Sequence, residues 1–71
     1  MMTFGQNLKR LRTKKYTPAM TQTEVEIAGD MALGILSQFE TDAREPSLRN
    51  LKKIKSGLGC TWEDLFNFEA D

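Results

Sequence analysis

The sequence predicts an all-α fold, a compact bundle of five short helices, and three observations predict it. Apolar residues recur at helical spacing in several separate segments. Ser or Thr stands directly before most of these segments, where a side-chain oxygen can cap a helix. Gly and Pro fall between the segments, where they interrupt helices. The 71 residues have room for one domain, for which we expect a core of about 4–66 and a C-terminal tail of 67–71.

Composition argues against several classes of protein. The chain has no His and a lone Cys60, so neither a metal site nor a disulfide framework is expected. The same lack of His, together with the absence of a glycine-rich phosphate loop, argues against an enzyme, and no cofactor is expected. Cys60 is interpreted as a small core residue. No apolar run approaches the roughly 18 residues of a membrane span, which predicts a cytoplasmic protein.

Charge is balanced overall but unevenly distributed. Net charge is zero, yet residues 1–16 and 46–60 carry basic residues without acids, whereas residues 22–45 are mostly acidic. A phosphate backbone would therefore meet the basic blocks and be repelled by the middle segment. The alternative is that each charged block is simply the solvated face of a helix.

The first two helices are predicted from their caps. Thr3 caps a helix that should stop near Tyr16, because Pro18 disfavours helix at the residue before it. After a connector, Thr21 caps the next helix, with Glu24 as its capping-box partner. The residues expected to face inward are Phe4, Leu8, Leu11, Val25 and Ala28.

The third helix is predicted at about 31–40. Gly29 and Asp30 break the preceding helix, and Asp30 is expected to cap the new one. The apolar set of this segment is wider than one buried stripe needs, so part of it should face outward. That set consists of Met31, Leu33, Ile35, Leu36 and Phe39.

A loop at 41–46 and two capped helices complete the chain. Ser47 caps a helix that Gly57 and Gly59 end, and Thr61 caps a short last helix with Asp64 at its third position. The residues expected on the inner faces are Leu48, Leu51, Ile54, Leu58, Leu65 and Phe66.

Taken in order, these pieces resemble the Cro and lambda-repressor-like helix-turn-helix family. The resemblance runs from Phe4 to about Phe66. Its motifs are Leu8 with Leu11-Arg12, Thr21-Gln22, Leu36-Ser37-Gln38-Phe39-Glu40, Glu45-Pro46-Ser47-Leu48, Leu51-Lys52-Lys53-Ile54, and the ending Leu58-Gly59-Cys60-Thr61-Trp62-Glu63-Asp64-Leu65-Phe66.

The resemblance implies a sequence-specific transcriptional regulator, a repressor, that binds double-stranded DNA as a homodimer in a prokaryotic cell or from a phage or plasmid gene. It also implies a structural ion pair between Arg12 and Glu40. Both residues directly follow core residues, so a bidentate pair could hold the third helix against the first. The alternative is that both are ordinary solvated charges.

In this family the third helix enters the major groove and the second crosses the phosphate backbone. The positions that match base contacts are Ser37, Gln38, Leu33 and Ala32. Gln38 could bind adenine in bidentate fashion, whereas Leu33 and Ala32 could touch only a thymine methyl. The expected phosphate contacts are Gln22, Thr21, Thr23, Arg44, Lys14 and Lys15.

The sequence departs from the family at Glu26, at Asp30 and along 32–34, where small, glycine and polar residues are usual. A carboxylate at the helix crossing should turn outward or find a cation. The apolar run Met31–Leu36 supports an alternative function, a helix-turn-helix fold that binds a protein partner through this segment. Trp62 and Phe68 are candidate dimer anchors, with packing in the monomer core as their alternative.

Overall fold

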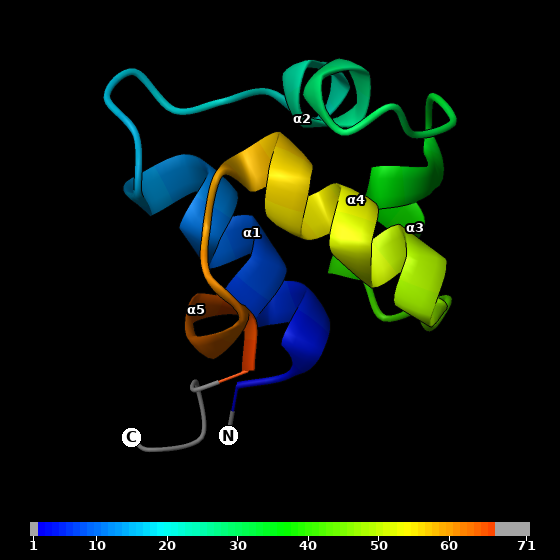
Figure 1. The fold of residues 1–71 in the computed structure, drawn as a ribbon. Helices are drawn as coiled ribbons and strands as arrows, with labels where there is room; N and C mark the ends of the chain where they lie inside the picture. Colours follow the sequence, from blue (N-terminus) through cyan, green and yellow to red (C-terminus); the bar gives the residue numbers. More distant parts are fainter. Residues whose placement is uncertain (1, 67–71) are drawn as a thin grey trace.

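Five helices occupy the part of the chain described by the computed structural model, residues 2–66 (Figure 1). They are α1 Phe4–Lys14, α2 Gln22–Ala28, α3 Ile35–Glu40, α4 Leu48–Leu58 and α5 Trp62–Phe66. The predicted all-α bundle is therefore confirmed. Helix α4 lies against α2, while α1 packs against α3 on one side and α5 on the other.

The predicted caps account for where most helices begin. Thr3 forms a capping box with Gln6 at the start of α1. Thr21 and Glu24 form the same reciprocal pair at the start of α2. At the two later helices, the Ser47 hydroxyl accepts the N–H of Asn50, and Thr61 and Asp64 exchange hydrogen bonds. Each pair satisfies backbone donors that a helix leaves free in its first turn.

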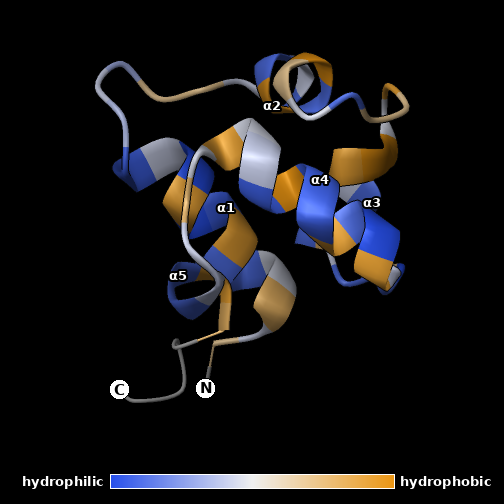
Figure 2. Cartoon of the chain, viewed as in Figure 1, coloured by the Kyte–Doolittle hydropathy of each residue, from blue (hydrophilic) through white to orange (hydrophobic). Residues whose placement is uncertain are grey.

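The core is formed by the inner faces of all five helices and the segments between them. Figure 2 shows hydrophobic residues gathered where the helices face one another. Cys60 is part of this core, as expected, and its burial raises the pKa of the thiol. The buried apolar residues are Leu8, Leu11, Val25, Met31, Leu36, Phe39, Ile54, Leu58, Cys60 and Leu65.

Three residues predicted to face inward are exposed. Ala28 lies outside because α2 turns Val25 and Glu26 toward the core instead. Leu48 occupies the first turn of α4 and is 65% exposed. Phe66 ends α5 at the edge of the bundle, where its ring packs beside that of Phe4.

Glycines allow the helices to approach closely. A Cβ atom on Gly57 would lie 2.5 Å from the Val25 carbonyl oxygen, and one on Gly29 would lie 2.4 Å from that of Lys53. Gly57 was expected to help end α4. It lies inside the helix instead, where the close contact with α2 leaves no room for a side chain. Gly59, with φ of 64°, provides the C-cap.

A polar contact joins the first and last helices. The fully buried side chain of Asn7 donates hydrogen bonds to the carbonyl oxygens of Asp64 and Leu65, at 3.1 and 3.0 Å. These carbonyls belong to the short α5, which makes no other helix contact as extensive as that with α1. The amide therefore fixes α5 on α1.

We expect Gly57→Ala to destabilise the fold, although Ala normally favours a helix interior by about 1 kcal/mol over Gly. The added methyl would meet the Val25 carbonyl, and overpacking of this kind costs about 1–3 kcal/mol. Urea denaturation followed by circular dichroism measures the change. Ser56→Ala, on the exposed neighbour, is the control. A Gly57→Ala protein as stable as that control would contradict the close contact of α2 and α4.

Candidate nucleic-acid interface

The α2–turn–α3 unit begins its second helix later than the sequence predicts. Helix α3 starts at Ile35, not at about residue 31, and its N-cap is Gly34 rather than Asp30. Asp30 and Gly34 both have positive φ values, 56° and 90°, so the chain between them cannot continue as a helix. Within this turn Met31 is buried, and its N–H donates to the Glu26 carbonyl at 2.8 Å.

Glu26 neither turns outward nor meets a cation, in contrast to the prediction. Its side chain is 2% exposed, and its Oε2 atom accepts the backbone N–H of Leu36 at 2.9 Å. The carboxylate thus lies at the positive end of α3, where free N–H groups favour an anion. Its backbone donor replaces the cation that the sequence led us to expect.

Arg12 and Glu40 form a bidentate ion pair between α1 and α3. The Arg12 Nε and Nη2 atoms donate to the two carboxylate oxygens at 2.6 and 3.0 Å. The side chains of Arg12 and Glu40 are only 12% and 3% exposed. Arg12 also donates to the Met20 carbonyl, and Gln22 donates to Glu40 at 3.0 Å. The pair therefore joins α1, α2 and the connector before α2 to the C-terminal end of α3.

The predicted phosphate contacts at the start of α2 are only partly free. One N–H of the Gln22 amide is engaged with Glu40, which leaves its second N–H and its oxygen available. The Thr21 hydroxyl accepts the cap hydrogen bond from the Glu24 N–H but can still donate its own proton. Thr23 is exposed beside it.

The residues predicted to contact bases lie on two different elements, α3 and the turn before it. Ser37 and Gln38 are exposed on α3, whereas Ala32 and Leu33 belong to the turn before it. The Ser37 hydroxyl donates to the Gly34 carbonyl at 3.0 Å. The Gln38 side chain makes no hydrogen bond to any residue in 2–66, so it is available to a ligand.

The basic candidates lie on different parts of the molecule. Arg44 is exposed in the loop after α3, and its backbone N–H donates to the Gln38 carbonyl. Lys14 ends α1 and is exposed. Lys15 forms an exposed ion pair with Asp64 of α5 at 3.2 Å. This hydrogen bond raises the pKa of Lys15, and the Thr61 backbone N–H is the main cause that lowers the pKa of Asp64.

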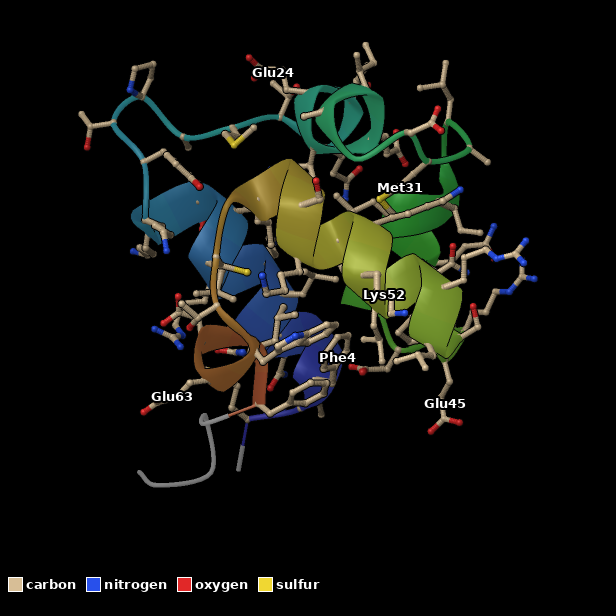
Figure 3. The ribbon with its side chains drawn as sticks, in the orientation of Figure 1. Phe4, Glu24, Met31, Glu45, Lys52 and Glu63 are labelled. Carbon is tan, nitrogen blue, oxygen red and sulfur yellow. The ribbon has the colours of Figure 1, made fainter. Side chains whose placement is uncertain are left out.

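Aromatic residues of α1 and α5 form a second exposed area. Trp62 is 39% exposed, stacks on Phe66 with ring centroids 6.2 Å apart, and has the Lys55 ammonium over its ring. Phe68, the other predicted dimer anchor, lies outside the described residues. A groove of about 410 Å³ adjoins this area, and Figure 3 shows two of its lining residues, Phe4 and Glu45. The groove is lined by Phe4, Asp42, Arg44, Glu45, Pro46, Leu51 and Phe66.

Two carboxylates shape the interface in ways that the sequence did not predict. Glu26 was expected to turn outward or meet a cation. No role was expected for Asp42, which accepts hydrogen bonds from the N–H of Gly5 and the hydroxyl of Thr3 at 3.0 and 2.6 Å. Asp42 thereby ties the loop after α3 to the start of α1. An acid among the inward positions of α2 was a signal for Glu26, but the sequence held no comparable signal for Asp42.

Two short helices joined by the turn 29–34, with the second helix clamped to α1, define a small helix-turn-helix domain of the Cro and lambda-repressor-like kind. No helix within residues 2–66 combines the length and apolar character needed to cross a membrane.

Comparison with known proteins identifies the family. Control protein C.MunI of a Mycoplasma species is 38% identical over 64 residues, covering 90% of this chain and 84% of its own. Control protein C.BamHI of Bacillus amyloliquefaciens is 32% identical over 65 residues, covering 92% and 78%. No family model and no solved structure matches the chain. The chain therefore belongs to the control-protein family.

We expect Arg12→Met to be strongly destabilising. It would leave Glu40 buried without its cation, and breaking a buried ion pair in this way costs about 3–5 kcal/mol. Urea denaturation measures the loss, and Arg49→Met, which removes an exposed charge of α4, is the control. Equal midpoints for the two variants would show that the pair does not hold α3.

Proposed function

We propose that the protein is a DNA-binding transcription regulator that acts through its α2–α3 unit. One observation carries the proposal: α3 buries one side and leaves the opposite side bare. Leu36 and Phe39 are fully buried, while Ser37 and Gln38 between them are exposed. A helix held in this way can enter a major groove, which is wide enough to admit it.

In this proposal Gln38 and Ser37 contact base edges. Leu33 and Ala32 touch thymine methyl groups from the turn, because neither side chain carries a polar group. The end of α1, the start of α2 and the loop after α3 contact the phosphate backbone. The proposed phosphate contacts are Gln22, Thr21, Thr23, Arg44, Lys14 and Lys15.

The proposed regulation is repression by a homodimer. A single module this small covers few base pairs, so a specific site is best built from two half-sites. The area around Trp62 is the proposed contact between subunits. It is supported by the exposure of Trp62 and of Phe66, which stacks on it, since neighbouring exposed apolar side chains mark protein contacts.

A second candidate function is supported by a different surface. Ile27 at the end of α2 and Leu33 in the following turn are 69% and 71% exposed. Figure 2 shows this turn as a hydrophobic edge of the molecule next to α2. If this edge bound a protein, the domain would be an interaction module rather than a DNA-binding one.

We expect Gln38→Ala and Arg44→Ala to weaken DNA binding in different ways. Loss of the Gln38 amide should relax preference at one base position, because a good bidentate contact gives about 1–3 kcal/mol of discrimination. Loss of Arg44 should weaken binding evenly across sequences and lower the salt slope by about one. Selection from a random duplex library at low and moderate salt measures both.

The wild-type protein in the same selection tests the function itself. Enrichment of a two-fold symmetric site supports the regulator. If the protein instead associates with a protein partner, and added DNA does not change that association, the interaction module is supported. If both variants bind every duplex as the wild type does, Gln38 and Arg44 are not DNA contacts.

We expect Trp62→Ala to weaken self-association at least tenfold, as truncation of a central aromatic anchor does. Sedimentation equilibrium measures the dimer dissociation constant, and circular dichroism checks that the helices are retained. Ile27→Ala, which removes an exposed apolar side chain of α2, is the control. A dimer of unchanged strength in Trp62→Ala would move the contact away from α5.

A further inference from the structure

Helix α3 begins without a cap of its own. Its N-cap residue is Gly34, which has no side chain to accept a hydrogen bond from the first turn. By contrast, α1, α2 and α4 each begin at a Ser or Thr whose hydroxyl accepts a backbone N–H. The start of α3 therefore lacks the local interaction that fixes where a helix begins.

Glu26 supplies that interaction from the neighbouring helix. Its Oε2 atom lies 2.9 Å from the Leu36 nitrogen, a donor in the first turn of α3. The same residue accepts the Met31 N–H through its backbone carbonyl at 2.8 Å. Glu26 thus holds the chain both where it leaves α2 and where it enters α3.

Burial of the Glu26 carboxylate makes its hydrogen bond with the Leu36 N–H necessary. Glu26 is 2% exposed, and neither of the ion pairs found among residues 2–66 includes it. A buried charge without water or a cation needs hydrogen-bond donors, and the free N–H groups and dipole at the start of a helix provide them. Removal of the carboxylate would leave the Leu36 N–H without a partner inside the protein.

We propose that Glu26 is a positioning residue that replaces the missing N-cap of α3 and so sets the residue at which α3 begins. Without this contact the first turn of α3 would have no fixed start and would fray. Ser37 and Gln38 follow directly on that turn, so the support that holds them in position would be lost. The effect on DNA rests on the proposed function, whereas the effect on α3 does not.

The opposite end of α3 is already fixed by Arg12 and Glu40, so the two clamps act at different ends of a helix of 6 residues. Between them, a Cβ on Gly5 would lie 2.4 Å from the Phe39 carbonyl, which shows how closely α1 covers the helix. Glu26 is therefore the contact that decides the direction of the N-terminal end.

Hydrogen exchange of the full chain tests the effect on α3 without DNA. The Ile54 amide, in the core of α4, serves as the internal reference. In Glu26→Ala we expect the exchange rate of the Leu36 amide to rise at least tenfold relative to that of Ile54, because the Leu36 N–H loses its buried acceptor. In Glu26→Gln we expect a smaller increase of about fivefold, because the amide oxygen still accepts but the charge is gone.

Glu24→Gln is the matched control, since Glu24 lies on the same helix but caps α2 itself. It should not change Leu36 exchange relative to Ile54. If Glu26→Ala does not fold, Glu26→Gln decides the matter alone. Equal changes at Leu36 and Ile54 in the folded variants would overturn the proposal, because they would mean general destabilisation only.

Selection on random duplexes measures the consequence for specificity. Glu26→Ala should lose at least tenfold in the ratio of selected-site to random-duplex affinity, and Glu26→Gln should retain most of that ratio. An unchanged ratio would overturn the link between Glu26 and specificity. If the wild type binds no duplex, the proposed function fails, while the exchange experiment still decides the role of Glu26.

Discussion

The ion pair between Arg12 and Glu40 is the constraint on which the arrangement of the first three helices depends. Apolar packing brings α1 and α3 together, but packing alone allows a short helix to slide or rotate. The guanidinium fixes both carboxylate oxygens and also holds the Met20 carbonyl before α2. Gln22 adds a third donor to Glu40, so the buried acid has partners from two helices. Removing one partner of such a buried, hydrogen-bonded ion pair strongly destabilises the fold.

The polar contacts and the apolar core of the domain have different roles. Leu8, Leu36 and Phe39 bury apolar surface and provide the driving force for packing. The buried polar side chains, in contrast, each join a particular pair of segments. Asn7 connects α1 to α5, and the proposed role of Glu26 is to direct the start of α3. No buried side-chain polar atom in residues 2–66 is left without a partner, which suits a small domain with little stability to spare.

Features encoded within a few residues could be predicted from the sequence. Contacts between distant residues could not, apart from the Arg12–Glu40 pair, which was expected from the family resemblance. The caps at Thr3, Thr21 and Ser47 depend on residues three positions away, and the structure contains them. The start of α3 was misplaced because it depends on Glu26, whose partner is ten residues further along. Asp30 has the composition of a cap, but its positive φ places it in the turn. The exposed positions of Leu48 and Phe66 reflect where neighbouring helices end, which periodicity alone does not reveal.

The late start of α3 has a consequence for how this domain would recognise DNA under the proposed function. The residues usually expected at the tip of the helix lie in an apolar turn, and the Ser37 hydroxyl already donates to Gly34. Gln38 is then the main donor available for direct contact with a base edge. One bidentate contact gives about 1–3 kcal/mol, far below the roughly 4–10 kcal/mol that separates specific from non-specific binding. Charge cannot make up this difference, because contacts to phosphates position a protein on DNA but carry no sequence information directly. Pairing of two domains on two half-sites is the simplest way to reach that specificity. The proposed subunit contact around Trp62 would then be as important to recognition as α3 itself.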